Sequence, residues 1–202
     1  MPPRLSNDDR RRLLQLARAA VTEIVLHNRI LPLPDSDGPL AERAGAFVTL
    51  FRAGRLRGCI GLPLADLTLG EAVIQAALGA ARGDPRFQPV SGVELHEIEI
   101  EISVLSPARP IDASQIEVGK HGLLVTRGTH RGLLLPQVAV ERAWTAQVFL
   151  EEVCRKAALP AEAWKDTATE LLAFTAEVFS EREFPETGLA APSERGQSWK
   201  NS

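Results

Sequence analysis

The sequence predicts an α+β protein built on antiparallel strands. Apolar residues recur at helical spacing over residues 7–28, and they alternate with polar residues over 95–105. Short apolar runs joined by turn residues predict two hairpins, one before and one after the alternating segment. The resulting order of helix, hairpin, helix, strand, hairpin and helices is that of an α+β protein with antiparallel pairing.

The helix over 7–28 is expected to begin after Ser6, because Ser6 and Asp9 have the spacing of a capping box. Its apolar side chains recur every three or four positions and are expected to face the core. They are Leu13, Leu14, Ala17, Ala20, Val21, Ile24 and Val25. The stretch that follows is predicted to be a loop, because it contains three prolines.

The first hairpin is predicted to have strands at 46–51 and 56–60, with its turn at residues 53–54. An alanine-rich helix is expected next, over about 69–82. Its candidate N-terminal caps are Asp66 and Thr68.

The strand over 95–105 is expected to have one buried and one polar face. The buried face carries Ile98, Ile100, Ile102 and Val104. The polar face carries Glu97, Glu99, Glu101 and Ser103. A polar face of this kind is normally open to solvent.

The second half of the chain is predicted to contain another hairpin and two helices. The hairpin strands span 122–126 and 132–135 around a turn at 127–130. Helices are expected over 141–158 and 167–179. The residues of the first of these helices that are expected to face the core are Ala143, Val148, Phe149, Val153 and Cys154.

Composition excludes several classes of function. The chain has 202 residues, of which 45% are hydrophobic and 24% charged, as in a soluble folded protein. The net charge of −3 gives no electrostatic basis for binding nucleic acid, and the run Arg10-Arg11-Arg12 is interpreted as a solvated helix face. No apolar run approaches the ~18 residues of a membrane span. Two cysteines and an N-terminus unlike a signal peptide favour a reducing compartment, the cytoplasm.

Cys59 is the strongest candidate for a catalytic residue. It lies between Gly58 and Gly61, and a glycine, lacking a Cβ, lets a ligand approach the backbone closely. A reactive thiolate needs a positive neighbour. Arg57 is expected to share the strand face of Cys59, and Arg55 is a further candidate. The alternative is that Cys59 is a small apolar side chain that fills a tight strand.

His121 and Glu101 are the candidate catalytic partners of Cys59. A histidine can serve as base to a cysteine from a distant part of the chain, and a strand carboxylate can orient that histidine or bind a cation. The alternatives to His121 are His27, His96 and His130. The candidates for substrate binding are Arg57, Gly58, Gly61, Arg86 and Gln137. A structural role is the alternative for Arg86 and Gln137.

The sequence predicts no metal site and leaves open whether a cofactor binds. It contains neither a Cys-x-x-Cys nor a His-x-x-x-His spacing. A metal site assembled from Cys59, His121 and Glu101 is left open as an alternative. The segment from Gly58 to Gly61 is too short for a phosphate-binding loop.

Six segments in register resemble the AMMECR domain family. The hexamer Leu56-Arg57-Gly58-Cys59-Ile60-Gly61 is the signature of that family. The other matching segments are Gly45-Ala46-Phe47-Val48-Thr49-Leu50, Asp84-Pro85-Arg86-Phe87, Ile100-Glu101-Ile102-Ser103-Val104-Leu105, Gly119-Lys120-His121-Gly122-Leu123 and Leu134-Leu135-Pro136-Gln137-Val138-Ala139, with Trp144 and Phe149-Leu150 after them.

The resemblance implies two interleaved subdomains with antiparallel sheets flanked by helices, over residues 10–183, and a polar tail at 184–202. Prokaryotic members resemble protein A of the AmmeMemoRadiSam system, which implies a Memo-type protein and a radical S-adenosylmethionine protein as partners. Two functions stay open. One is a small-molecule enzyme that uses Cys59 as nucleophile or acid–base group. The other is a non-catalytic module that presents the hexamer to a protein or ligand.

Overall fold

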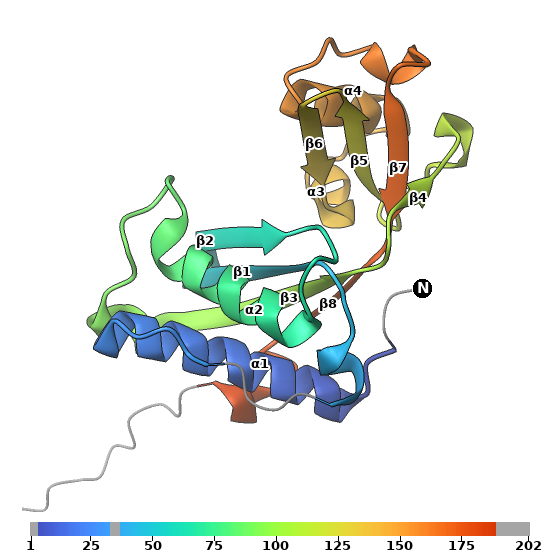
Figure 1. The fold of residues 1–202 in the computed structure, drawn as a ribbon. Helices are drawn as coiled ribbons and strands as arrows, with labels where there is room; N and C mark the ends of the chain where they lie inside the picture. The colour runs from blue at the N-terminus through green and yellow to red at the C-terminus, as the bar shows by residue number, and fades with distance from the viewer. Residues whose placement is uncertain (1–3, 33–36, 189–202) are drawn as a thin grey trace, which may run out of the picture.

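The protein folds into two lobes, each built on a four-stranded antiparallel sheet (Figure 1). The structure is a computed structural model and describes residues 4–32 and 37–188. The helices are α1 (Asn7–Thr22), α2 (Leu69–Leu78), α3 (Pro136–Glu141) and α4 (Ala146–Lys156). The strands are β1 (Ala46–Arg52), β2 (Arg55–Leu62), β3 (Ile98–Leu105), β4 (Arg109–Pro110), β5 (Gly122–Arg127), β6 (His130–Leu134), β7 (Glu170–Phe174) and β8 (Ala176–Ser180). None of the described helices is long and apolar enough to cross a membrane.

The first lobe packs α1 and α2 against one face of the sheet β2-β1-β3-β8 (Figure 1). Alternate residues of β1 and β3 point into this layer and are fully buried. They include Val48, Leu50, Ile100 and Ile102. A buried ion pair between Arg18 and Glu181 joins α1 to the segment after β8, and Glu181 also accepts a hydrogen bond from the backbone of Ile100. Helix and sheet therefore share one apolar core.

The second lobe is inserted between β3 and β8 and contains the sheet β4-β7-β5-β6. Its core is formed mainly by α4 against β5 and β6. Phe149, Val153 and Cys154 of α4 are fully buried there, together with Leu123 and Val125 of β5.

The two lobes meet through a small apolar cluster. Leu105 of β3 and Phe47 of β1 pack with Leu124 of β5 and Phe174 of β7. Phe47 belongs to the face of the first sheet that α1 and α2 do not cover. The second lobe therefore packs against that uncovered face at Phe47.

Most of the predicted elements are confirmed. The capping box of Ser6 and Asp9 starts α1, which continues as a π-helical turn to His27. Thr68, rather than Asp66, caps α2. Both hairpins are present, and the turn of the first has positive φ at Ala53 (50°) and Gly54 (73°), as tight hairpins require. The long strand starts later than expected, because residues 92–97 form 3₁₀ turns.

The prediction of a helix over 167–179 is wrong. This segment forms β7 and β8, which pair with β5 and β3 respectively. The helix predicted over 141–158 is also shorter, because α4 spans only Ala146–Lys156. Glu141 is instead the last residue of α3 (Pro136–Glu141). Ala143 lies in the connection between them with a φ of 51° and is exposed, so it does not face the core.

The packed chain extends past residue 183. Phe184 and Thr187 are buried, and Phe184 belongs to the core of the first lobe. The division of the chain between 183 and 184 stays a prediction, and residues 189–202 of the predicted tail lie outside the described residues.

Candidate functional site

Cys59 lies on β2, the edge strand of the first sheet, on the face where Phe47 packs against the second lobe. Thr49 of β1 is directly opposite Cys59, and Glu101 of β3 is directly opposite Thr49. Residues opposite one another in an antiparallel sheet point to the same face. Cys59, Thr49 and Glu101 therefore form one polar row across three strands. Two strand spacings separate its ends by about 10 Å.

The Cys59 thiol is half-buried, and its pKa is raised. Burial raises the pKa of this thiol, although the hydroxyl of Thr49 donates a hydrogen bond to Sγ at 3.3 Å and lowers it. The charge of Arg86 also lowers the pKa, while the charges of Asp84 and Glu101 raise it. A thiolate thus forms only when a proton is taken away during binding or reaction.

Asp84 and Arg86 hold the backbone of Cys59 at the open edge of the sheet. The carboxylate of Asp84 accepts a hydrogen bond from the Cys59 N–H at 2.9 Å. Arg86 donates to the Cys59 carbonyl at 3.4 Å and to Asp84 through Nε and Nη2 at 2.9 and 2.6 Å. Asp84 is buried, and its pKa is held well below the usual range, chiefly by Arg86. The pair gives both polar backbone groups of Cys59 a partner that an edge strand otherwise lacks.

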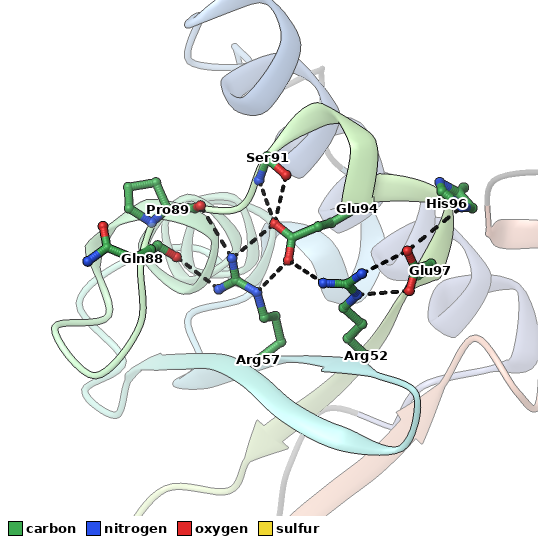
Figure 2. A network of polar contacts seen from close by, with 8 residues as sticks. All are labelled: Arg52, Arg57, Gln88, Pro89, Ser91, Glu94, His96 and Glu97. Carbon is green, nitrogen blue, oxygen red and sulfur yellow. Dashed lines mark hydrogen bonds and ion pairs between the residues drawn. The ribbon is translucent and has the colours of Figure 1, made fainter.

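Arg57 does not supply the positive charge expected beside Cys59. The register of β1 and β2 shifts between Leu50 and Phe51, which leaves Arg57 as an extra residue in the strand. Its guanidinium binds Glu94 at 3.0 and 3.1 Å, together with the carbonyls of Gln88 and Pro89 (Figure 2). The β-bulge redirects this side chain, so the expectation that Arg57 acts on the thiol is wrong.

The Arg57 network fixes β2 to the segment that precedes β3. Arg52 of β1 binds both Glu94 and Glu97, and the backbone and hydroxyl of Ser91 donate to Glu94 (Figure 2). The hydrogen bonds from Arg57 and then from Ser91 lower the pKa of Glu94 to about 2. Arg57 is therefore a structural anchor of the hexamer rather than a group that faces Cys59.

The two glycines of the hexamer are required by packing. A Cβ at Gly58 would lie 2.2 Å from the carbonyl oxygen of Ala80, in the π-helical turn that follows α2. A Cβ at Gly61 would lie 2.1 Å from the ring of Phe47. Neither glycine has a positive φ. We expected these glycines to make room for a ligand. In the structure the space beside them is filled by other parts of the protein, which approach the backbone closely.

Glu101 is a half-buried carboxyl group for which the described residues supply no hydrogen bond or ion pair. Burial raises its pKa, and the neighbouring charges of Glu141, Glu99 and Glu183 raise it further. The polar face of β3 is not open to solvent as expected, because Glu101 is half-buried and Ser103 on the same side is buried. A carboxyl group with a raised pKa is suited to donating a proton.

His121 and Gln137 lie on the second lobe, apart from Cys59. The Nδ1 atom of His121 accepts a hydrogen bond from the backbone of Glu117 at 3.1 Å, and its ring lines a surface cavity with Arg109 and Phe174. Gln137 is on α3 and lines a separate cavity with Val178 of β8. No described contact brings either residue to the thiol, so a Cys59–His121 pair is not formed in this structure.

Lys156, which the sequence did not single out, is the last residue of α4 in the second lobe, and its side chain is exposed. Partial desolvation lowers the pKa of Lys156, the charge of Cys59 raises it, and the charge of Arg86 lowers it. No described contact joins Lys156 to the thiol.

Relatives of the chain are found by sequence and by structure. The sequence model of a family described as AMMECR1 matches residues 14–179. The chain belongs to the AMMECR1 family. A protein of Methanothermobacter thermautotrophicus is 46% identical over 186 residues, which cover 88% of this chain and 96% of the relative. Protein TK0174 of Thermococcus kodakarensis is 46% identical over 185 residues, covering 86% and 90%.

A solved AMMECR1 relative has the same fold. The crystal structure of uncharacterized protein PH0010 from Pyrococcus horikoshii matches with a TM-score of 0.80 and 42% identity, over 84% of this chain and 90% of that one. The names of these relatives state no activity, so they assign no role to Cys59.

The AMMECR1 site described here is not arranged as a metal centre. Within residues 4–32 and 37–188, no three His, Cys, Asp or Glu side chains gather in a way that would hold a metal ion. The alternative metal site of Cys59, His121 and Glu101 is therefore not assembled, because His121 belongs to the other lobe and faces another cavity.

Proposed function

We propose that this AMMECR1 protein is a small-molecule enzyme that uses Cys59 as a nucleophile or acid–base group. The observation that carries the proposal is the polar row of Cys59, Thr49 and Glu101, on the sheet face where Phe47 packs against the second lobe. A sheet face under another lobe is normally apolar, and here it carries a thiol, a hydroxyl and a carboxyl group. Such a concentration of titratable groups with shifted pKa values is typical of active sites.

The geometry favours proton exchange across a bound molecule rather than direct transfer between protein groups. Cys59 and Glu101 stand at the two ends of the row, with Thr49 between them. A small substrate lying over Thr49 reaches both ends. The sulfur of Cys59 bonds to an electrophilic atom of the substrate while the thiol proton passes to solvent water. The bond from that atom to the leaving group breaks, and the leaving group takes a proton from Glu101. Thr49 orients the sulfur through the hydrogen bond at 3.3 Å.

A non-catalytic binding module is the second candidate. The raised pKa of Cys59 favours it, because a protonated thiol is a poor nucleophile. The packing roles of Gly58 and Gly61 also show that the hexamer is shaped by the interior of the protein. On this account the site binds a ligand or partner without turning it over.

Turnover of a metabolite extract separates the two functions. The purified protein, Cys59→Ser and Cys154→Ser are each incubated with the extract, and untargeted mass spectrometry follows every component with time. An enzyme depletes one component, Cys154→Ser retains that activity, and Cys59→Ser loses it. Thermal melts show that each variant is folded. Depletion by Cys59→Ser at the parent rate would contradict the catalytic role, and depletion by no protein would favour the binding module.

The partners implied by the family resemblance belong to the same proposal. A Memo-type protein and a radical S-adenosylmethionine protein would supply the substrate or take up the product in the cytoplasm. Co-purification of the tagged chain with either protein tests this part of the proposal, and its absence would leave the chain as an enzyme acting alone.

A further inference from the structure

The second lobe carries a surface cavity of about 500 Å³ at the end of β7. The described residues that line it include none of Cys59, Thr49 and Glu101, so it is separate from the polar row. Its volume is that of a pocket for a small organic molecule. Apolar side chains form most of its wall, and they are Pro107, Pro110, Ile111, Ala173 and Phe174.

Arg109 is the charged side chain of this cavity. It is exposed, and among the residues that the structure describes its guanidinium has no ion pair and no hydrogen bond. No acidic side chain of the described chain lines the cavity with it. A guanidinium without a partner, at the rim of an apolar pocket, is well suited to binding a carboxylate or phosphate oxygen.

The acidic side chains closest to the cavity lining in sequence already have partners of their own. The carboxylate of Asp112 accepts hydrogen bonds from the backbone and the hydroxyl of Ser114 at 2.8 and 2.5 Å. The carboxylate of Glu117 pairs with the amine of Lys120 at 2.7 Å. Neither carboxylate therefore neutralises Arg109.

His121 offers the cavity a hydrogen-bond donor in a fixed tautomer. Its Nδ1 atom accepts a hydrogen bond from the backbone N–H of Glu117 at 3.1 Å, and its own backbone N–H donates to the carbonyl of Glu117 at 3.0 Å. An imidazole nitrogen that accepts a hydrogen bond carries no proton, so the ring proton lies on Nε2. The ring lines the cavity, and among the described residues Nε2 has no partner.

Strand β7 lies between the strands that position these two side chains. Arg109 of β4 is opposite Ala173 of β7, and Gly122 of β5, directly after His121, is opposite Phe174. β4 and β5 are therefore two strand spacings, about 10 Å, apart. A carboxylate fits between a long arginine side chain and an imidazole ring at this separation.

The cavity also lies where the chain passes between the lobes. Its wall includes Ser106, directly after β3, and Thr175, between β7 and β8. The Ser106 N–H donates to the carbonyl of Thr175 at 2.9 Å, and the Thr175 N–H donates to Oγ of Ser106 at 2.9 Å. A molecule bound here thus touches both connections between the lobes.

We infer that this cavity binds a small organic anion, a carboxylate attached to an apolar body. The carboxylate pairs with the guanidinium of Arg109 and accepts a hydrogen bond from Nε2 of His121. The apolar body lies against Phe174 and Ile111. An inorganic ion would leave this apolar wall in water, whereas an apolar body covers it and gains the free energy of burial. The site goes beyond the proposed function, because it does not use Cys59.

Three probe molecules test which part of the ligand is recognised. Phenylacetate, phenylacetamide and acetate are titrated into the ¹⁵N-labelled protein at constant pH and ionic strength, and the amide resonances of Arg109, Ile111, His121 and Thr175 are followed by NMR. Phenylacetate should shift these resonances in a saturable way. Phenylacetamide lacks the charge and acetate lacks the ring, so each should bind about fivefold more weakly or worse. Equal affinity for phenylacetate and either other probe, or no saturable shift with phenylacetate, would overturn the inference.

Two arginine variants locate the charge that attracts the anion. Arg109→Gln should weaken binding of phenylacetate about fivefold, because the charge-assisted hydrogen bonds to the carboxylate are lost. Arg131→Gln is the matched control, since Arg131 is an exposed arginine of the same lobe outside the cavity lining, and it should bind as the parent does. Unchanged binding by Arg109→Gln, or an equal fall in both variants, would overturn the inference.

His121→Asn separates binding by the ring from its role in the turn. The amide oxygen of asparagine takes the position of Nδ1 and keeps an acceptor for the N–H of Glu117, whereas no atom takes the position of Nε2. Binding of phenylacetate should weaken about threefold while the remaining resonances of the protein stay in place. Parent affinity in a folded His121→Asn protein would overturn the assignment of Nε2 as the donor.

Discussion

The two faces of the first sheet have opposite chemistry. The face toward α1 and α2 is formed by fully buried apolar side chains, among them Val48, Leu50, Ile100 and Ile102. The face toward the second lobe carries Cys59, Thr49, Glu101 and Ser103. Because consecutive strand residues point to opposite faces, residues adjacent in the sequence have different roles. One set holds the fold together, and the other forms the candidate site.

The largest expected effect separates two adjacent residues of β3. Ile102→Ala should lower the free energy of unfolding by about 3 kcal/mol, because it opens a cavity in the core of the first lobe. Glu101→Gln should change it by about 0.5 kcal/mol or less, since the carboxyl group has a raised pKa and no described partner. Denaturant unfolding measures both. Similar losses for the two variants would mean that the faces do not differ as described.

The hexamer glycine on the helix side gives the next largest effect. Gly58→Ala should cost about 2 kcal/mol, because its Cβ would lie 2.2 Å from the carbonyl of Ala80 and must push the turn after α2 away. Gly83→Ala is the matched control, since nothing lies within 4 Å of its Cβ and its φ is not positive. Equal melting temperatures for the two variants would refute the packing role.

The anchor of Arg57 predicts a dependence of stability on pH. The folded pKa of Glu94 is about 2 against an ordinary value of 4.5. Because the pKa of Glu94 is lower in the folded state than in the unfolded state, its ion pair stabilises the folded protein fully above pH 4.5. This stabilisation is lost as the pH falls toward 2. Glu94→Gln should therefore be less stable than the parent at pH 7 by about 1.5 kcal/mol. Unfolding curves measured over this range should converge at the acid end, and a constant difference would contradict the assignment.

The two residues that hold the Cys59 backbone should act on its thiol in opposite directions. Asp84→Asn removes a charge that raises the pKa of Cys59, whereas Arg86→Gln removes one that lowers it. The pH profile of iodoacetamide labelling should move to lower pH in the first variant and to higher pH in the second. If the two substitutions acted only by loosening β2, both labelling profiles would move in the same direction, which would contradict this prediction.

Much of the first lobe could be predicted from local pattern. The capping box at Ser6 and the alternation over 98–104 were visible because each depends on residues close in sequence. The segment 167–179 was misassigned because its alanine, leucine and glutamate residues favour a helix, while strand pairing with β5 and β3 overrides that preference. The start of α3 was missed although Pro136 at its first position is a known signal.

The site was less predictable, because it depends on register and on the arrangement of the lobes. A β-bulge opposite Leu50 and Phe51 turns Arg57 away from Cys59. No residue type in β2 predicts this bulge. Asp84 and Arg86 were visible as a motif, but their hydrogen bonds to the Cys59 backbone could not be predicted from it.

Native-state labelling of the two cysteines tests the central claim most directly. Cys59 lies half-buried on the polar face, and Cys154 is fully buried in the second lobe. Iodoacetamide should modify Cys59 in the folded protein at least about ten times faster than Cys154, at a rate that rises with pH because burial raises the pKa of the thiol. Modification of both cysteines only on unfolding, at one common rate, would contradict the account and leave Cys59 as a filler of the sheet.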